Sequence, residues 1–370
     1  MGVKMVYQRK ELLAALMLCG RVVSKRAFKP ILANVRLNGL CEATDLECAV
    51  TVGFNGHEAA EGPAVVLPCG RLKDVVKAAT GDELDIVTEG RTSTIGAAVL
   101  LGEDPEEYPV IPGAPMGANI VSAQRLKSAI ERTTFAAAKE RSRFAFNGVR
   151  LQADGDGVLR LIATDRKRVA VAEVPAPEFP SSFRCGHIVP TRSLETVAYA
   201  IGKDDGEVLV TFDERSATFQ GSTKAGGFWR VSTRLVDGAF PKYESVIPRD
   251  AKVTATLDRA AFLAALKQVQ PFTNEEARAV TLSALNQNGL TIHAQTVDVG
   301  KCFAGALCTF DGEWADPIGF NPTFLIEGLE AFAADTVVLA ISGKDTPALI
   351  SAAGDTYRYV VMPVQSRNAK

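Results

Sequence analysis

Apolar residues recur along the chain in two spacings, one typical of helices and one typical of strands. Leu12, Leu13 and Leu16 have helical spacing, and similar amphipathic patterns predict helices over 9–22, 123–136 and 258–269. A second series of helices is predicted over 71–79, 191–201 and 322–332. Alternating apolar and polar residues between these segments predict strands, with turn signals such as Asn38-Gly39.

These predicted elements follow the same order three times. Asn-Val-Arg-Leu at 34–37 recurs as Gly-Val-Arg-Leu at 148–151, and Ala-Thr-Asp at 43–45 recurs at 163–165. An aromatic-Pro pair followed by Val-Ile-Pro closes the first two repeats, at 108–112 and 240–248. The matches are 114 to 136 residues apart and keep their order, which indicates an internal repeat of domain size.

The repeat predicts an α+β fold of three similar domains, with two helices packed on antiparallel sheet in each. The domains are expected at 1–117, 118–249 and 250–370, and the Pro-rich stretches at 109–115 and 241–248 read as linkers. Sheets repeated in this way have edges that must be paired, and a closed ring would pair them.

Composition places the chain among ordinary globular proteins. Apolar residues make up 47% and charged residues 23% of its 370 residues, which excludes a disordered, collagenous or coiled-coil chain. The N-terminus has no signal-peptide h-region and no run approaches a membrane span, so a cytoplasmic protein is expected. Seven cysteines without C-x-x-C spacing read as small buried residues in a reducing compartment.

The near-neutral charge of −2 conceals a separation between helices and the rest of the chain. The six helical patterns with their flanks hold 18 Lys/Arg and 8 Asp/Glu, whereas the remainder holds 23 and 35. Each basic helix alone could be a solvated face. If all share one side of the molecule, they suggest a surface that follows a phosphate backbone without reading sequence, because no base-reading motif is present.

Motifs that carry enzyme chemistry are incomplete. Gly343-Lys344 lacks the first glycine and the Ser/Thr of a phosphate loop, and His57-Glu58 lacks the second histidine of a zinc-protease motif. Asp-Gly-Asp-Gly at 154–157 lacks the other ligands of a calcium loop and reads as a hairpin turn. We therefore expect no metal, no cofactor and no catalytic activity.

Several motifs resemble one known family. They are Lys-Pro-Ile-Leu at 29–32, Ala-Thr-Asp at 43–45 and 163–165, Asp-Gly-x-Phe-Pro-x-Tyr at 237–243, Gly-Phe-Asn at 319–321, and Tyr-Val-Val-Met-Pro at 359–363. In this colinear order they resemble the bacterial DNA polymerase III beta subunit, the replicative sliding clamp. The resemblance spans the whole chain.

The resemblance implies that two protomers join head to tail into a six-domain ring around duplex DNA. Helices would line the hole, and the ring would act as a processivity factor that is opened by the ATPase of another protein. Arg26 aligns with a DNA contact of the family, and helix placement adds the other candidate lining residues Lys73, Lys77, Arg125, Lys127, Arg141 and Arg143. By position, the protomers would meet through Ala98, Leu100, Pro271 and Phe272.

The family also has an apolar pocket between domains 2 and 3 that receives short peptides. Its partners include the polymerase III alpha subunit, clamp-loader subunits and other proteins with a clamp-binding motif. Core packing is the commoner role of each position taken alone, and convergence from four distant segments is what favours a pocket. Carried over by position, the pocket wall would comprise Phe146, Thr164, Arg168, Val169, Pro241, Val246, Asn321, Phe324, Val360, Val361, Met362, Pro363 and Val364.

The chain departs from the family pattern near this pocket. A Gly-His-Arg type run is replaced by Arg166-Lys167-Arg168, a common basic residue by Ser245, and an aromatic by Ala277. The chain also continues past Val364 to Lys370. These departures leave open a specialised or inhibitor-resistant clamp paralogue with altered partners. A multidomain enzyme with an unfamiliar site is the third hypothesis.

Overall fold

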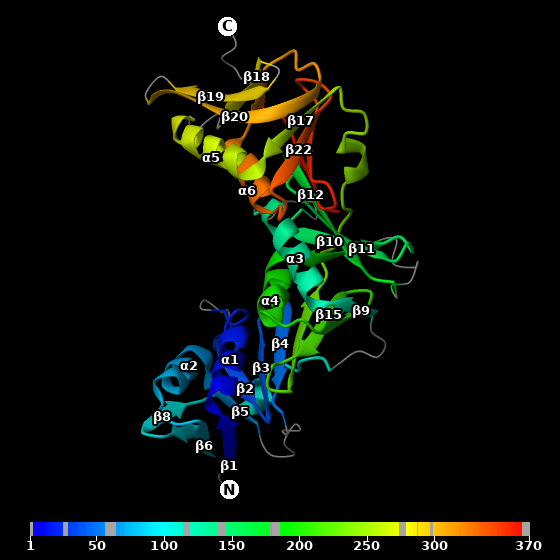
Figure 1. The fold of residues 1–370 in the computed structure, drawn as a ribbon. Helices are drawn as coiled ribbons and strands as arrows, with labels where there is room; N and C mark the ends of the chain where they lie inside the picture. The colour runs from blue at the N-terminus through cyan, green and yellow to red at the C-terminus, as the bar shows by residue number, and fades with distance from the viewer. Residues whose placement is uncertain are drawn as a thin grey trace.

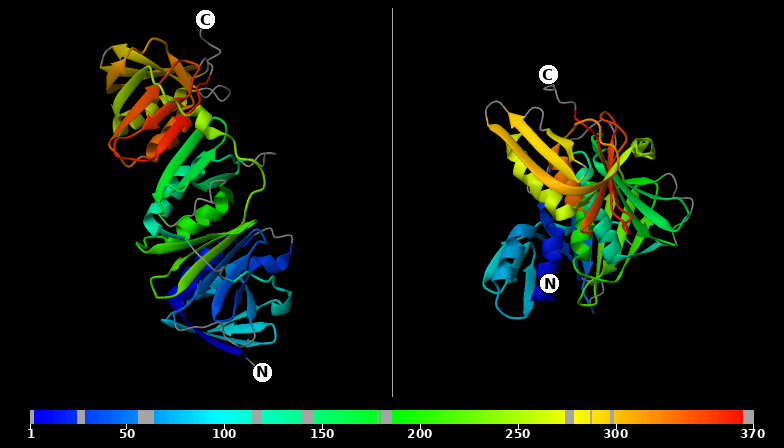
Figure 2. Two further views of the ribbon diagram at one scale, coloured as in Figure 1. Left: turned by 90° about the vertical axis from the view of Figure 1, so that its right-hand side faces the viewer. Right: turned by 45° about the horizontal axis from the view of Figure 1, so that its top comes forward.

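The computed structural model describes residues 3–24, 29–55, 64–113, 119–139, 146–177, 179, 186–273, 279–286, 288–296 and 299–364. Three units of mixed helix and sheet follow one another along a bent molecule, and the helices lie on the inner side of the bend (Figure 1). Figure 2 shows the same succession from two further directions. Every pairing among the described strands is antiparallel.

The first unit contains two α-helices between two sets of four strands. Its helices are α1 (Arg9–Cys19) and α2 (Cys69–Ala78). One set of strands is β1 (Val3–Gln8), β6 (Glu83–Glu89), β7 (Thr92–Ile95) and β8 (Ala98–Leu101). The other is β5 (Val65–Pro68), β2 (Asn34–Leu37), β3 (Leu40–Thr44) and β4 (Cys48–Gly53). The 3-10 turns are η1 (Pro30–Ala33) and η2 (Pro105–Glu107).

The second unit repeats this plan. Its helices are α3 (Ala123–Thr133), which tightens into η3 (Thr134–Ala136), and α4 (Thr191–Ile201). One set of strands is β9 (Asn119–Ser122), β14 (Glu207–Phe212), β15 (Ser216–Ser222) and β16 (Phe228–Arg234). The other is β13 (His187–Pro190), β10 (Gly148–Ala153), β11 (Val158–Thr164) and β12 (Arg168–Pro175).

The third unit repeats it again after the turn η5 (Tyr243–Val246). Its helices are α5 (Arg259–Val269), followed by η6 (Gln270–Phe272), and α6 (Pro322–Glu330). One set of strands is β17 (Val253–Asp258), β22 (Thr336–Ile341), β23 (Ala348–Ser351) and β24 (Arg358–Val361). The other is β21 (Ile318–Phe320), β18 (Val280–Asn286), β19 (Gly289–Thr296) and β20 (Gly300–Gly312).

The apolar spacing that predicts the helices also buries them. Leu12, Leu16 and Cys19 of α1 are fully buried, and they are four and three residues apart, so they lie on one face of the helix. Side-chain caps start α5, where Asp258 accepts from the Ala261 N–H at 2.7 Å, and α6, where Asn321 accepts from the Thr323 N–H at 2.9 Å. The six predicted helices are confirmed with ends shifted by a few residues.

Two of the sheets cross from one unit to the next. The last strand of the second unit, β16, pairs with β4 of the first, and the last strand of the third unit, β24, pairs with β12 of the second. The result is one eight-stranded and one twelve-stranded sheet beside the four-stranded sheet β1-β6-β7-β8. Both junctions join equivalent strands of successive repeats.

The two predicted linkers differ in how closely they are packed. Val110 of the first linker is 90% exposed, although Tyr108 just before it is buried. Tyr108 is 4% exposed among Ile31, Leu32 and Val66, and its hydroxyl donates to the Asn34 carbonyl at 3.2 Å. Tyr243 of the second linker is 6% exposed. Its phenol is buried, and this burial raises its pKa. Tyr243 packs with residues of the second and third units, so the second linker helps to hold these two units together.

Candidate binding surfaces

The Ala-Thr-Asp motif forms the same turn in the first two units. Thr44 and Thr164 each donate their hydroxyl to the carbonyl four residues ahead, at 3.0 and 2.7 Å. The carboxylates of Asp45 and Asp165 each accept two backbone N–H groups within the turn. The motif therefore stabilises the same turn in both units, which explains its recurrence.

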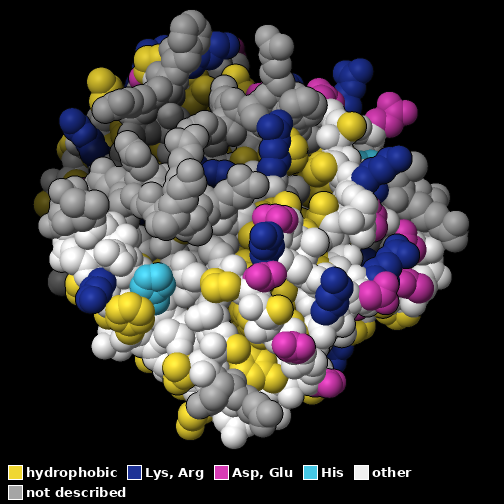
Figure 3. All heavy atoms as spheres, turned by 90° about the horizontal axis from the view of Figure 1, so that it is seen from above, with side chains coloured by type: hydrophobic (Ala, Val, Ile, Leu, Met, Phe, Trp, Pro, Cys, Tyr) yellow, Lys and Arg dark blue, Asp and Glu magenta, His cyan; other side chains and the backbone are white. Residues whose placement is uncertain are grey.

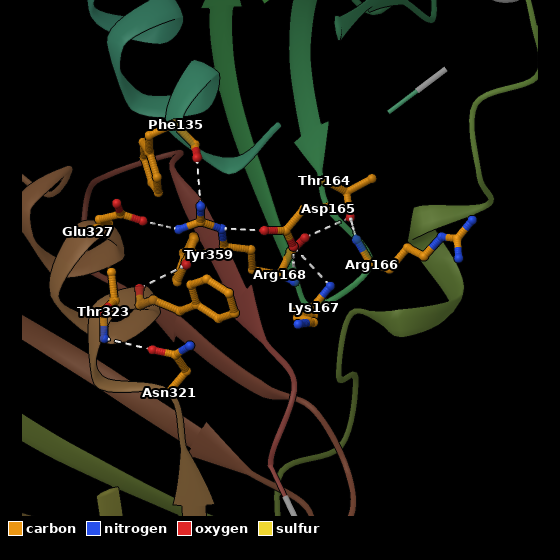
Figure 4. Close-up of polar contacts among 11 residues, drawn as sticks. Phe135, Thr164, Asp165, Arg166, Lys167, Arg168, Asn321, Thr323, Glu327 and Tyr359 are labelled. Carbon is orange, nitrogen blue, oxygen red and sulfur yellow. Dashed lines mark hydrogen bonds and ion pairs between the residues drawn. The ribbon is translucent and has the colours of Figure 1, made fainter. Parts of the chain in front are cut away.

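In the second unit the turn places the Arg168 side chain in a buried cluster between domains 2 and 3 (Figure 4). The guanidinium donates to Asp165 Oδ2 at 3.0 Å, to the Phe135 carbonyl at 2.7 Å and to Glu327 of α6. Its Cζ lies 4.4 Å from the centroid of the Phe324 ring. Because Arg168 is only 4% exposed, its charge is satisfied inside the protein.

Close packing of α6 on β24 brings Glu327 to this cluster. A Cβ atom at Gly328 would overlap the ring of Tyr359, so a larger residue would move the helix outward. The Tyr359 hydroxyl donates to the Phe324 carbonyl at 2.9 Å. Burial lowers the pKa of Arg168, but Tyr359, Glu327 and Asp165 outweigh it and hold that pKa above its usual range.

The predicted pocket residues belong to four segments that meet at this junction, but they do not form one cluster, because Val361 and Phe324 pack with the main core. Phe146, Thr164, Arg168, Val169, Val360 and Val361 are buried, whereas Pro241, Val246, Asn321, Phe324, Met362, Pro363 and Val364 are partly exposed. Val169, Val360 and Val246 belong to one apolar cluster with Ile162, Val171, Phe240, Tyr243, Ile247 and Leu349. Seven of the thirteen predicted side chains therefore reach the surface.

Two of these residues have structural roles that account for their presence. Thr164 holds the turn through its hydroxyl, and Asn321 caps α6. The C-terminal strand is held alongside them, because the Met362 N–H donates to the Lys167 carbonyl and the Val364 N–H to the Gly319 carbonyl, both at 2.8 Å. Sequence reasoning missed Tyr243 as part of this cluster, although it lies in the quoted Phe-Pro-x-Tyr motif.

A cavity of about 420 Å³ lies beside this cluster and shares the Tyr243 wall with it. Its lining is mixed, and the polar part includes Gln152, Asp154, Arg160 and Arg358. Arg160 is paired with Asp154, Asp156 and Glu173 at 2.9, 2.6 and 3.2 Å. These charges satisfy one another, and the apolar part of the wall is formed by Tyr243, Ile247, Pro248 and Leu349.

The predicted lining residues differ in how accessible their charges are. Lys77 and Arg125 are exposed, and Lys73 is partly exposed. The Lys127 ammonium already donates to the Gly202 carbonyl at 2.6 Å and lies 3.8 Å from Glu131. Arg26, Arg141 and Arg143 lie outside the described residues, as do Ala277 and the segment 365–370. Lys77 and Arg125 are therefore the best placed of the described candidates.

Two strand edges remain open where the repeat predicts partners. β8 is the last strand of the first unit, as β16 and β24 are of the others, yet within the described residues it pairs only with β7. β20 is equivalent to β4 and β12, and its Gly300–Leu307 part pairs only with β19 there. Hydrophobic side chains also lie at the surface of the domain 3 end, between scattered charges (Figure 3).

The side chains at these edges differ in part from those predicted. Leu100 is 8% exposed and packs into the core of its own unit, whereas Val99 and Leu101 are 64% and 72% exposed. On β20, Phe303 and Leu307 are 58% and 84% exposed. Ala98 is partly exposed, Pro271 is exposed, and Phe272 packs partly against the core. The strand alternation places the accessible side chains one residue away from Leu100.

Among the residues that the structure describes, no group of three His, Cys, Asp or Glu side chains could hold a metal ion. No described helix is both long and apolar enough to span a membrane.

Comparisons with known proteins agree on one family. Models of the N-terminal, central and C-terminal domains of the DNA polymerase III beta subunit match residues 3–112, 120–242 and 244–365. The beta sliding clamp of Pseudomonas aeruginosa is 30% identical over 370 residues, which cover 97% of this chain and 98% of the relative.

Solved structures give the same result. The crystal structure of the DNA polymerase III subunit beta from Pseudomonas aeruginosa has a TM-score of 0.88 at 27% identity, covering 98% of this chain and all 100% of that one. A clamp from the same organism bound to griselimycin has a TM-score of 0.87 at 28% identity, covering 99% and 100%. With the three-domain clamp fold and its repeated junctions, these matches show that the chain belongs to the DNA polymerase III beta subunit family, the beta sliding clamps.

Proposed function

We propose that this chain is a processivity factor whose two protomers close a ring around duplex DNA. The observation that carries the proposal is the repeated junction: β4–β16 and β12–β24 are equivalent pairings, and β20 with β8 of a second protomer would be the third. A head-to-tail arrangement satisfies both open edges at once. The same proposal places the domain boundaries at 117/118 and 249/250. It also places the protein in the cytoplasm, where the DNA is.

The inner helices would contact DNA phosphates without reading bases. Exposed Lys77 and Arg125 supply positive charge there, whereas Lys267 of α5 is neutralised by Glu330 of α6 at 2.6 Å. Retention would then come from enclosure of the DNA, with phosphate contacts that are weak and interchangeable. The chain would need no catalytic step of its own, and ring opening would fall to the ATPase of a clamp loader.

Reversing both charges, as Lys77→Glu with Arg125→Glu, is expected to reduce retention on circular DNA and its salt dependence. Four phosphate contacts per ring would be lost, so the slope of log retention against log salt should fall by about 3 to 4. The measurement is retention on circular and linearised DNA after loading by the matching clamp loader. The charge swap Lys267→Glu with Glu330→Lys is the control, since it keeps the charge of the inner face.

Parent protein that stays equally long on linearised and circular DNA would contradict encirclement. Reversal variants with an unchanged salt slope would instead leave encirclement standing and remove these two residues from the DNA contact.

We further propose that partner peptides, including those of the polymerase, dock between domains 2 and 3. Phe324 on α6 packs partly against the main core beside Arg168, and Met362 follows β24; both side chains are partly exposed. Phe324→Ala with Met362→Ala is expected to weaken binding of a polymerase-derived peptide by at least about tenfold, because two apolar contacts are lost. Calorimetry measures the peptide affinity, and native mass spectrometry checks that the dimer persists. Dissociation of the dimer would show that these residues belong to the interface.

The inhibitor-resistant paralogue remains the second candidate, and the Arg166-Lys167-Arg168 run together with Ser245 favours it. Because a related clamp binds griselimycin, titration with this compound separates the two readings. Binding of both griselimycin and the peptide favours a general clamp, whereas binding of the peptide alone favours the paralogue.

A further inference from the structure

The sheet junctions differ on their outer face, which is the face away from the helices (Figure 1). At the β12–β24 junction this face is apolar and covered, because Val169, Val171 and Val360 are at most 5% exposed. The second linker packs on these residues through the side chains of Phe240, Tyr243, Val246 and Ile247. A segment that crosses the outer face therefore completes this junction.

The outer face of the β4–β16 junction is polar instead. Thr51 and Ser232 occupy the positions equivalent to Val171 and Val360, and they are 2% and 9% exposed. The hydroxyls of Ser232 and Thr218 share a hydrogen bond of 3.1 Å. Strand pairing at a junction therefore tolerates small polar side chains on this face.

The two open edges carry large apolar side chains on the same outer face. Val99 and Leu101 of β8 are 64% and 72% exposed, and Phe303 and Leu307 of β20 are 58% and 84% exposed. The Phe303 ring stacks on His293 of β19, with the ring centroids 4.8 Å apart. We call Val99, Leu101, Phe303 and Leu307 the inter-protomer strip, because the proposed ring joins the two edges that carry them.

Ring closure would gather this strip without covering its outer side. β8 and β20 lie at opposite ends of the molecule (Figure 1), so in the proposed ring they belong to different protomers. Strand pairing would set Val99 and Leu101 beside Phe303 and Leu307 of the second protomer, where they bury one another in part. The two linkers follow the first and second units of one chain, so neither crosses the junction between two chains. The strip would thus form an uncovered apolar surface.

We propose that the inter-protomer strip is a second docking site, which binds a linear segment of a partner protein with one aromatic and two aliphatic residues. The second linker is the template for this segment, because Tyr243, Val246 and Ile247 cover the equivalent face of the β12–β24 junction. The chain beyond Val364 reads Gln-Ser-Arg-Asn-Ala-Lys, which is too polar for this role.

Each protomer supplies half of the strip, so this site exists only where the ring is closed. A partner that docks there would distinguish closed rings from open ones. The inference rests on the proposed function, because it requires that two protomers pair through β8 and β20.

The test titrates the parent dimer with a fluorescent peptide of residues 239–249, which contains the second linker. Excess polymerase-derived peptide is present to occupy the proposed pocket between domains 2 and 3. We expect a Kd on the order of 100 µM, because a short flexible segment loses conformational entropy on binding. A peptide with Tyr243→Ser and Ile247→Ser should bind at least about tenfold more weakly. Fluorescence anisotropy measures both affinities, and photo-crosslinking from the peptide should label β8 and β20.

Val99→Thr with Phe303→Thr is expected to weaken peptide binding at least about tenfold and to keep the dimer, because threonine suits a strand and the β4–β16 junction is polar on this face. Leu285→Thr is the matched control, since Leu285 is 66% exposed on β18, which β19 separates from β20. Native mass spectrometry checks the dimer. If the double variant dissociates, Leu307→Thr alone replaces it in the same comparison.

A dimeric parent that does not bind the linker peptide, or binding that survives in the threonine variant, would overturn the docking site. Association of parent dimers into larger particles that the threonine variant abolishes would overturn it too, because a second ring would then cover the strip. A monomeric parent would instead contradict the proposed ring, so failure of the proposed function is distinguishable from failure of this inference.

Discussion

Arg168→Met is expected to lower the free energy of unfolding of the joined domains 2 and 3 by about 3 kcal/mol. The substitution leaves the carboxylates of Asp165 and Glu327 without their cation and the Phe135 carbonyl without its donor. Glu327 is 31% exposed, so solvent compensates it in part and the loss lies at the lower end of the range for a broken buried ion pair. Urea unfolding followed by circular dichroism measures the effect.

The first domain junction supplies a matched control. Arg192 of α4 pairs with Asp45 at 3.2 Å and donates to the Arg21 carbonyl at 2.6 Å, much as Arg168 joins the next two domains. Its side chain is 59% exposed, so Arg192→Met should cost less than about 1 kcal/mol. Equal losses for the two variants would contradict the importance of burial at Arg168.

A rescue variant separates lost packing from lost charge. Adding Asp165→Asn and Glu327→Gln to Arg168→Met removes the unpaired carboxylates and should restore part of the stability. Peptide binding should stay weak, because Arg168 no longer supports Phe324 from a distance of 4.4 Å. Arg168→Met as stable as the parent would show that the cluster does not hold the junction.

Val99→Lys with Leu101→Lys is expected to convert the proposed ring dimer to monomer. Outward-facing residues of the equivalent strands β16 and β24 are buried at the junctions within the chain, for example Ser232 at 9% and Val360 at 0% exposure. Two ammonium groups placed there without partners should weaken dimerisation by at least about 100-fold, and lysine also protects strand edges from pairing. Native mass spectrometry reports the dimer, and retention on circular DNA reports ring closure.

Val87→Lys is the control, because Val87 is 38% exposed on β6 of the same sheet but not on its end strand. Phe303→Lys with Leu307→Lys on β20 should have the same effect as the β8 variant. A mixture of the two variants retains one intact β8–β20 junction, so it should form dimers that do not stay on circular DNA. Homodimers of either variant, or closed rings from the mixture, would contradict the head-to-tail arrangement.

Local sequence information was sufficient for the helices, the repeat and the family. The spacing of Leu12 and Leu16 sets which side of α1 is buried, and the Thr-Asp motif encodes a turn through hydrogen bonds within five residues. Those features depend on residues that are close in the chain, so they can be predicted without a structure. The resemblance to the beta subunit family, drawn from short colinear motifs, is confirmed by the comparisons.

The roles of individual residues on the edge strand β8 were harder to predict from the sequence. Ala98, Val99, Leu100 and Leu101 are all apolar, so alternation in the sequence does not indicate which side chains face the core. The structure buries Leu100 and exposes the residues on either side of it. Arg168 was predicted at the pocket wall, but nothing local reveals that Glu327, 159 residues away, neutralises it.

Patterns within the sequence were enough to predict three repeats of helix and antiparallel sheet, the concentration of basic residues in the helices, and the family. The enclosure of Arg168, and the open edges of β8 and β20 among the described strands, are evident only in the folded chain. The physical reason is the range of the interactions. Periodicity, capping and turn formation act between residues a few positions apart, whereas charge compensation and strand pairing at the junctions join residues more than a hundred positions apart, which only the folded chain brings into contact.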